Sequence, residues 1–359
     1  MKIDQEYVYP FNVTIQGVRG LAILMIFFLH AFSSALRYQW ITIIPGIGFK
    51  HYLLMCGNAG VDIFFIIAGY LAVNSMINEI SFAKYILKRI IRIYPVFLIL
   101  LVFTYCIGPL FPHNFLSNIS VRGFLSSFIF NVLLLPGILD RPPAIPVSWA
   151  LSYIFLFYIL WGISYRAYKN IHDSIFHVLA LAVSSAGFIF FIYFHPRSIF
   201  FFIGIFVYYS EPYLKNHIRE RSYYAFISII SLLLMISFLS LSEYKESKVY
   251  LIFIASTFGY LFFLLTIMNN KLIFINNSWG SRVMTFMGNI SYSFYLIHGF
   301  GLYLIVKIFN KFDLMHFIHI GSLFLFIAIS LIVSIFLSWV SYKFIEVRFT
   351  NEFLKKCFL

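Results

Sequence analysis

Residues 14–32 read Thr14-Ile-Gln-Gly-Val-Arg19-Gly-Leu-Ala-Ile-Leu-Met-Ile-Phe-Phe-Leu-His30-Ala-Phe32, an apolar segment of membrane-spanning length that carries two ionisable side chains. Ionisable groups inside a membrane span are energetically costly, so Arg19 and His30 are candidate functional residues. On a helix their offset corresponds to about 1100°, roughly 20° past three turns, so both side chains share one face and lie roughly 16 Å apart. The segment therefore predicts a helix with a cation near one membrane surface and an imidazole deeper along the same path.

The composition extends this interpretation to the whole chain. Of its 359 residues, 62% are hydrophobic and 11% are charged, whereas a soluble domain carries about 25% charged residues. The mean hydropathy is +0.91. The sequence therefore predicts an all-α polytopic membrane protein, with residues 1–359 forming one transmembrane domain and no soluble domain.

The net charge of +13 fits cytoplasmic loops that follow the positive-inside rule. No basic patch lies on a soluble face, so nucleic-acid binding is excluded. The cysteines Cys56, Cys106 and Cys357 are scattered and lack metal-ligand spacing, and we expect no metal site.

Apolar segments of about 20 residues predict about ten membrane spans. They lie near residues 13–35, 57–77, 93–111, 148–168, 175–194, 197–210, 222–241, 249–268, 286–307 and 317–341. A further apolar segment, 123–135, is short.

Basic residues assign sides to these spans. They gather in alternate connections and in the tail, as Lys84, Lys88, Arg89 and Arg92; Arg166 and Lys169; Lys215, Arg219 and Arg221; Lys271 and Arg282; and Lys343, Arg348, Lys355 and Lys356. These groups all face the cytoplasm only if segment 123–135 does not cross the membrane. We therefore expect a re-entrant or interfacial element on the outer side and both termini in the cytoplasm. The Pro-rich segment 136–146 then forms a constrained outer loop.

This topology places Asp62, near the start of the second span, at a depth comparable to that of His30. A carboxylate beside an imidazole fixes its tautomer and raises its basicity. The functional hypothesis is a general base, His30, oriented by Asp62. The alternative is a structural ion pair or a helix-capping Asp.

Arg89 and Arg92 are three residues apart and therefore share one helical face. Arginine guanidinium groups suit phosphate and pyrophosphate, which favours binding of a nucleotide or coenzyme. Basic clusters beside a membrane also commonly serve topology and lipid head groups, and this alternative stays open.

Four further residues have both a functional and a structural interpretation. Trp149 and Tyr153 lie at the predicted outer end of a span, where aromatic residues usually anchor the helix in the interface. His298 is a second intramembrane imidazole, either a hydrogen-bonded core residue or part of a site. Arg197 is expected on the outer side, where it would bind a sugar or a carboxylate, or extend towards the membrane surface.

Taken in order, these segments resemble the acyltransferase-3 family of integral membrane acyltransferases over nearly the whole chain. Arg19 and His30 match the family's Arg/Lys-x10-His signature in the first span. The remaining matches are Gly60-Val-Asp62-Ile-Phe-Phe with Gly69, Arg89-Ile-Ile-Arg92-Ile-Tyr-Pro95, Trp149-Ala-Leu-Ser-Tyr153, Arg197 with Phe202-Ile-Gly204, Ser291-Tyr-Ser-Phe-Tyr-Leu-Ile-His298, and Glu346.

Three positions depart from the family pattern. Ile154 stands where the family usually has a Glu, Ala68 replaces the Ser of the second-span motif, and Arg348 replaces a common Pro. If the missing carboxylate assists catalysis, its loss would slow the reaction, alter the acceptor or leave the chain inactive. If it is a structural partner, a second change would compensate for it.

The resemblance implies transfer of an acyl group, usually acetyl, from cytoplasmic acyl-CoA to a sugar hydroxyl of a surface polysaccharide such as lipopolysaccharide O-antigen, in the bacterial inner membrane. The partners are then acyl-CoA, a polysaccharide or lipid-linked glycan, and membrane lipids. The implied catalytic residues are His30, Asp62 and Arg19. Arg89, Arg92 and Arg19 would bind the coenzyme, and Arg197, Trp149, Tyr153 and His298 would bind the acceptor. The alternatives are a transporter for a lipid-linked sugar and a catalytically silent scaffold.

Overall fold

The computed structural model describes residues 13–40, 47–79, 81–110, 116, 119–139, 141–217, 223–269, 278–314, 320–350 and 352. Within these ranges every regular element is helical, so the all-α prediction is confirmed. The predicted cytoplasmic residues Arg219, Arg221, Lys271, Lys355 and Lys356, and both termini, lie outside the described residues.

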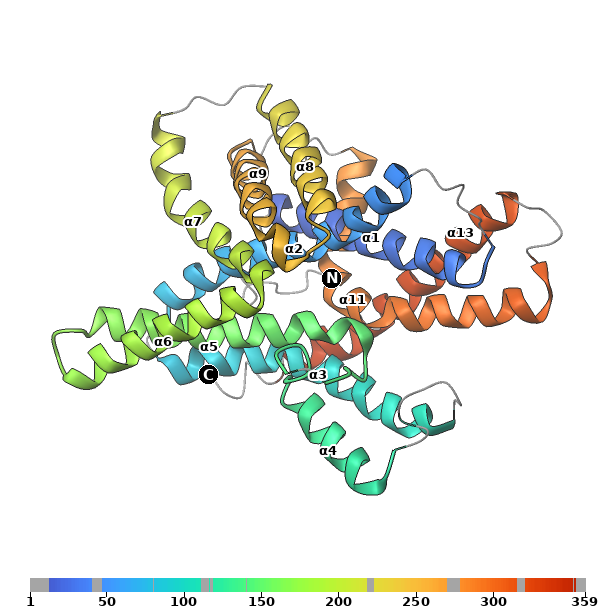
Figure 1. Cartoon of the computed structure of the whole chain (residues 1–359), viewed down its shortest axis with the longest axis horizontal. Helices are drawn as coiled ribbons and strands as arrows, with labels where there is room; N and C mark the ends of the chain where they lie inside the picture. The colour runs from blue at the N-terminus through green and yellow to red at the C-terminus, as the bar shows by residue number, and fades with distance from the viewer. Residues whose placement is uncertain are drawn as a thin grey trace. The chain divides into compact units, whose positions relative to one another are not determined.

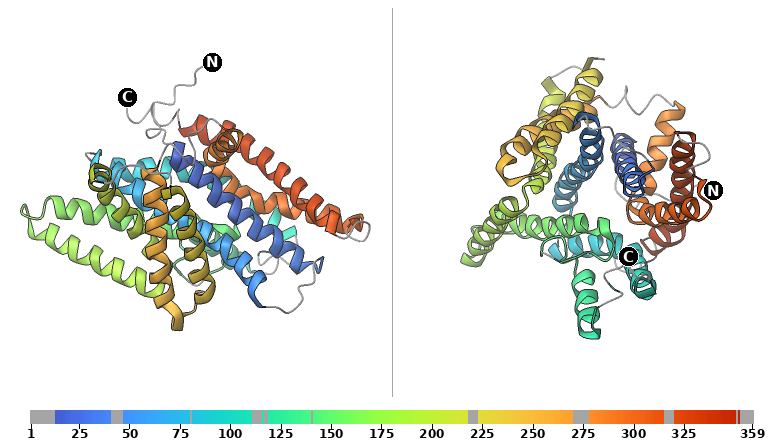
Figure 2. Two further views of the ribbon diagram at one scale, coloured as in Figure 1. Left: turned by 90° about the horizontal axis from the view of Figure 1, so that it is seen from above. Right: turned by 45° about the vertical axis from the view of Figure 1, so that its right-hand side comes forward.

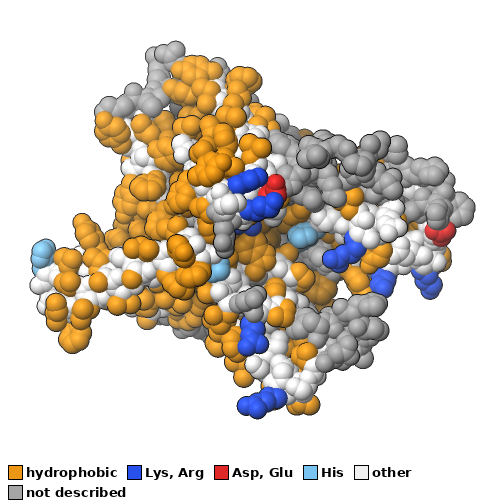
Figure 3. All heavy atoms as spheres, in the orientation of Figure 1, with side chains coloured by type: hydrophobic (Ala, Val, Ile, Leu, Met, Phe, Trp, Pro, Cys, Tyr) orange, Lys and Arg blue, Asp and Glu red, His pale blue; other side chains and the backbone are white. Residues whose placement is uncertain are grey.

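Nine helical segments of the described chain are long and apolar enough to cross a membrane. They involve α1 (Val13–Arg37), α2 (Ile47–Ile77), α3 (Phe82–Ile107), α5 (Trp149–Lys169), α6 (Ile175–Phe194), α8 (Tyr223–Ser242), α9 (Val249–Met268), α11 (Trp279–Lys311) and α13 (Ile320–Ser341). Hydrophobic side chains cover much of the surface that Figure 3 presents. The chain is therefore a multi-pass membrane protein.

The two remaining predicted segments form α7 and α4. Residues 197–210, predicted as a span, contribute to η4 (Pro196–Ser198) and α7 (Ile199–His217), whose second half carries Glu211 and Lys215. The helix α4 (Val121–Val132) has 12 residues, about 18 Å at about 1.5 Å per residue, so it is too short to cross a hydrocarbon core of about 30 Å. The expected shorter element is thus confirmed as a helix.

The chain divides into two compact units. Unit 1 comprises Met1–Ile77 and Ile189–Ser338, and unit 2 comprises Asn78–Phe188 and Trp339–Leu359.

In unit 1, α1 and α11 run side by side in the same direction (Figure 1). Their backbones touch at two glycines: a Cβ atom on Gly20 would lie 2.1 Å from the Met284 carbonyl oxygen, and one on Gly288 would lie 1.9 Å from that of Gln16. Small residues permit such close approach of membrane helices. Further along, the rings of Phe27 and Phe294 meet edge to face, with centroids 5.9 Å apart. This contact fixes the register of the two helices.

A second parallel pair in unit 1 consists of α2 and α7. A Cβ atom on Gly69 would lie 2.0 Å from the Phe201 carbonyl oxygen, and one on Gly204 would lie 2.0 Å from that of Ile66. By contrast, α8 and α9 form an antiparallel hairpin (Figure 2), in which Ser228 bonds the Phe262 carbonyl. These relative directions agree with the order of crossings predicted for these segments.

Unit 2 packs α5 and α4 against α3. Gly162 of α5 gives room to the Phe82 and Tyr85 rings of α3. The Ser120 hydroxyl caps α4 by accepting a hydrogen bond from the Gly123 amide. Near the end of α4, the buried Asn131 accepts a bond from the Ala144 amide at 2.8 Å, which ties the Pro-rich loop to this helix.

Candidate functional site

Two imidazoles meet where α1 and α11 run together. The rings of His30 and His298 have centroids 5.1 Å apart and are tilted by 42°. His298 is fully buried, whereas His30 is half-buried. Because the glycine contacts set the register of the two helices, each imidazole is held by packing rather than by a flexible loop. The sequence identified both residues as candidates but gave no reason to pair them.

The hydrogen bonding of His298 defines its tautomer. Its Nδ1 lies 2.9 Å from the Phe294 carbonyl oxygen, and a carbonyl can only accept a hydrogen bond. The neutral ring therefore carries its proton on Nδ1 and presents a lone pair on Nε2. This Nε2 is buried and has no hydrogen-bond partner among the described residues. Buried polar atoms without a hydrogen-bond partner are uncommon in proteins, so this Nε2, beside a second imidazole, is a candidate contact for a polar ligand.

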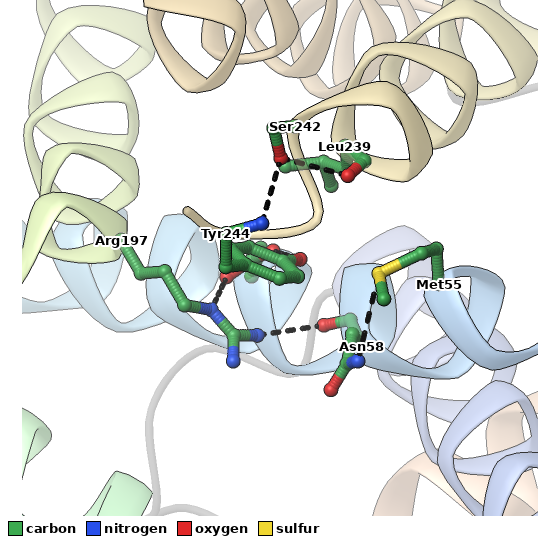
Figure 4. A network of polar contacts seen from close by, with 7 residues as sticks. Met55, Asn58, Arg197, Leu239, Ser242 and Tyr244 are labelled. Atoms are coloured by element: carbon green, nitrogen blue, oxygen red, sulfur yellow. Dashed lines mark hydrogen bonds and ion pairs between the residues drawn. The ribbon is translucent and has the colours of Figure 1, made fainter. Parts of the chain in front are cut away.

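Asp62 belongs to a different cluster. Its fully buried carboxylate accepts a hydrogen bond from Arg197 Nε at 2.8 Å on one oxygen and from the Tyr244 hydroxyl at 2.8 Å on the other. Arg197 Nη2 also donates to the Asn58 carbonyl at 2.9 Å, as Figure 4 shows. The predicted Asp62–His30 pairing is therefore wrong. The two residues do lie on adjacent helices, but the carboxylate pairs with a guanidinium, the stronger partner for a buried negative charge.

Arg197 was expected to bind a sugar or a carboxylate, and the carboxylate it binds here is Asp62. Its guanidinium carbon also lies 4.5 Å from the centroid of the Tyr244 ring. Burial raises the pKa of the Tyr244 phenol well above its usual value, and the Asp62 carboxylate raises it further. The hydroxyl therefore stays protonated and remains a donor to Asp62.

The two clusters connect through α11. The Tyr295 ring packs against His298, with centroids 6.4 Å apart, and against Phe64 of α2, at 6.3 Å. Phe64 follows Asp62 by two positions on the same helix. Packed rings thus link α2, two residues after Asp62, to the imidazole pair. Sequence analysis missed Tyr295 as a site residue because an aromatic residue at helical spacing usually belongs to the core.

Arg19 lies on the same continuous helix as His30, as expected, and is buried. Its Nη1 donates to Gln16 Oε1 at 3.2 Å, next to the point where Gly20 meets α11. A buried cation thus lies in the first third of α1, 11 residues before His30 on the same helix.

A further polar cluster, in which Glu211 is buried and Lys215 is exposed, lies on the later turns of α2 and α7. The Tyr70 hydroxyl donates to Glu211 at 2.6 Å, and Lys215 pairs with the same carboxylate at 2.5 Å. Sequence analysis named Lys215 only as a cytoplasmic basic residue and did not identify Tyr70 or Glu211. The lysine one turn after the glutamate was the only local signal, and that spacing is common on exposed helix faces.

In unit 2, Arg89 is buried with its guanidinium carbon 4.5 Å from the centroid of Tyr158 and 5.2 Å from that of Tyr85. Arg92 is half-exposed on the same helix. Cation–π contacts with two tyrosine rings therefore hold the Arg89 guanidinium in place. A role in membrane topology alone would not require these contacts.

The remaining predicted residues of unit 2 lie on α5 and near the end of the described chain. The rings of Trp149 and Tyr153 meet edge to face with centroids 5.3 Å apart. Ile154, at the position of the family glutamate, is half-buried. Glu346 is buried in a π-helix, Tyr342–Val347, a backbone form that is frequent at functional sites. Within the described residues, no group of three His, Cys, Asp or Glu side chains could hold a metal ion.

The helices and these clusters define a multi-pass membrane protein with polar sites buried among its spans. A family described as an acyltransferase domain matches residues 12–343, nearly the whole chain. The chain therefore belongs to the acyltransferase-3 family and is a membrane acyltransferase. No curated protein and no solved structure matches it.

Proposed function

We propose that the protein transfers an acetyl group from cytoplasmic acetyl-CoA to a sugar hydroxyl of a surface polysaccharide, such as lipopolysaccharide O-antigen, in the bacterial inner membrane. Membership of the family supports acyl transfer. The observation that carries the proposal is the imidazole pair, His30 and His298, fixed between α1 and α11 with a free lone pair on His298 Nε2.

His30 acts as the general base. It takes the proton from the acceptor hydroxyl as the oxygen attacks the carbonyl carbon of the thioester. A C–O bond forms and the C–S bond breaks, and His30 returns the proton to the departing thiolate, so that the products are the acetylated sugar and coenzyme A. A positioned base typically contributes about 10²–10⁴-fold to the rate.

His298 binds the acceptor beside this base. Its Nε2 lone pair accepts a hydrogen bond from a second hydroxyl of the sugar. Because the Nδ1 proton is engaged with the Phe294 carbonyl, the ring is oriented before the acceptor arrives. Sugars with neighbouring hydroxyls suit a site that presents two imidazoles 5.1 Å apart.

The donor's phosphates are bound by arginines. Arg89 and Arg92, both on α3, bind the coenzyme at the cytoplasmic surface. On α1, Arg19 also binds the coenzyme, and the pantetheine arm extends along this helix towards His30. The aromatic contacts of Arg89 support this assignment over a role in topology alone. Asp62 holds Arg197 by an ion pair, and Arg197 contributes to binding of the acceptor. The rings of Trp149 and Tyr153 on α5 also contribute to binding of the acceptor.

One observation favours a second candidate, a catalytically silent family member that acts as a scaffold. Ile154 places an apolar side chain where the family usually has a carboxylate. A transporter of lipid-linked sugars would also carry buried charges among its spans.

Acetylation of surface glycan separates these functions. We expect NMR and mass spectrometry of glycan from cells with the chain to show O-acetyl groups that are absent without it. In proteoliposomes, the wild-type protein should transfer radiolabelled acetyl from acetyl-CoA to isolated glycan, whereas His30→Gln should not. Unchanged acetylation after deletion of the chain would refute acetyl transfer and favour a scaffold or a transporter.

A further inference from the structure

Tyr244 lies in the short connection between α8 and α9, outside every predicted span. It reaches Asp62 of α2 and Arg197 before α7 from a third part of the chain. Figure 4 shows its ring beside the Arg197 guanidinium. One side chain thus contacts both members of a buried ion pair, through its hydroxyl and through its ring face.

The backbone that carries Tyr244 is strained. Glu243 and Tyr244 have φ values of 49° and 54°, two successive non-glycine residues in the left-handed region. Such conformations are costly and persist where surrounding contacts enforce them. Such strain is typical of a functional constraint.

Local hydrogen bonds hold this turn in place. The Ser242 hydroxyl donates to the Leu239 carbonyl at 2.7 Å and accepts from the Tyr244 amide at 3.2 Å. On the exposed side, Glu243 forms ion pairs with Lys245 at 2.5 Å and Lys248 at 3.5 Å. These contacts hold the backbone of the turn and thereby fix the position of the Tyr244 side chain.

The helix that carries Asp62 also packs against the helix that carries His298. Asp62 and Arg197 join α2 to the segment that begins α7, and Phe64 of α2 packs against Tyr295, which packs against His298. Because Asp62 and Phe64 belong to one helix, a shift of α2 at the Asp62–Arg197 pair would also move Phe64 and the Tyr295 ring packed against it. Acceptor geometry would change, whereas Arg89 and Arg92, assigned to the donor, lie on α3 and form no part of these contacts.

We propose that Tyr244 is a positioning residue for acyl transfer: by clamping the Asp62–Arg197 pair from a strained turn, it orients the acceptor beside His30. The inference rests on the proposed function. It assigns a role to a residue that no local sequence signal marks.

Tyr244→Phe tests the role because it removes the hydroxyl and keeps the ring over Arg197. Tyr250→Phe, on the exposed face of α9, is the matched control. With rates normalised to folded protein, we expect kcat/KM for the acceptor glycan to fall about tenfold, as for loss of a hydrogen bond to a charged group. KM for acetyl-CoA should stay within about twofold of wild type. Wild-type kinetics, or equal losses for both substrates, would overturn the proposal.

A second measurement does not depend on activity. Cys56 precedes Asn58, the residue whose carbonyl Arg197 binds, by two positions. In a Cys106→Ser, Cys357→Ser background, Tyr244→Phe should increase maleimide labelling of Cys56 severalfold, and Tyr250→Phe should not. Equal labelling of the two variants would overturn the clamp. Faster labelling in Tyr244→Phe, with no acetyl transfer by wild-type protein, would refute the proposed function and leave the clamp supported.

If Tyr244→Phe does not fold, Ser242→Ala provides the same test. It keeps Tyr244 and removes the hydroxyl that holds the turn. We expect the same split between acceptor and donor kinetics, with a smaller loss. Wild-type acceptor kinetics in this variant would contradict the role of the strained turn.

Discussion

His30 of α1 and His298 of α11 face each other with ring centroids 5.1 Å apart, although they come from opposite ends of the chain. Among the described residues neither imidazole is paired with a charged side chain, and the packing of two parallel helices brings the rings together. That packing places side by side the two imidazoles to which we assign the roles of general base and acceptor ligand.

The first prediction separates the roles of the two imidazoles. His30→Gln should reduce acetyl transfer by about 10²–10⁴-fold, because the base is lost. His298→Gln should mainly raise KM for the acceptor, because a binding contact is lost. His172→Gln, in an exposed connection, is the control. Full activity of His30→Gln in correctly inserted protein would eliminate His30 as the base.

The second prediction concerns the contact between α1 and α11. Gly20→Ala and Gly288→Ala each place a methyl group within about 2 Å of a backbone carbonyl, so the helices must separate, at a cost of about 1–3 kcal/mol. Both variants should unfold at a lower temperature in detergent and lose activity. Gly299→Ala, beside His298, adds a methyl group with no neighbour within 4 Å and should leave stability unchanged. Equal melting temperatures for all three variants would refute the close contact.

The third prediction tests the proposed donor site. Arg89→Ala should raise KM for acetyl-CoA, and Arg89→Lys should not restore it, because an ammonium group does not stack between Tyr85 and Tyr158 as a guanidinium does. Arg92→Ala should act in the same direction. Arg122→Ala, exposed on α4, is the control. Normal KM with reduced membrane insertion would assign the pair to topology.

The fourth prediction addresses the departure from the family. Ile154→Glu restores the usual carboxylate at a half-buried position of α5. We expect turnover of folded protein to be preserved or increased. Protein that fails to fold would show that the surroundings of residue 154 have been repacked around an apolar side chain.

The fifth prediction follows from the raised pKa of Tyr244. A phenol whose pKa is higher in the folded than in the unfolded protein contributes its stability fully below the unfolded value of about 10, and loses it as pH rises through the folded value. The difference in melting temperature between wild type and Tyr244→Phe should therefore be constant from about pH 6 to about pH 9. A difference that disappears within this range would mean that the phenol titrates below its ordinary pKa, and would contradict the raised pKa.

The sequence predicted the spans well because a membrane helix must satisfy its backbone hydrogen bonds internally and expose apolar side chains to lipid. The starts of α1 and α6 and the short α4 follow directly from that rule. Depth was also predictable: Asp62 and Arg197, placed on the same side from loop charges, form an ion pair.

Which residues meet across the helices was less predictable. Hydropathy gives the depth of Asp62 but not the neighbour that its side chain faces, so the carboxylate was paired with His30 instead of Arg197. Tyr244 could not be found, because its role depends on two left-handed residues in a short polar connection. The close contacts of Gly20 and Gly288 could not be predicted either, because the sequence does not show which backbone carbonyl lies opposite each glycine.

The glycine contact between α1 and α11 has a consequence for biosynthesis. During translation α1 enters the bilayer first, and α11, which completes the imidazole pair, follows only after most of the chain has left the ribosome. Until then His30 has no second imidazole beside it. With the roles proposed for the two imidazoles, the enzyme would stay inert while it is being made and would become competent in a late assembly step, when α1 and α11 associate.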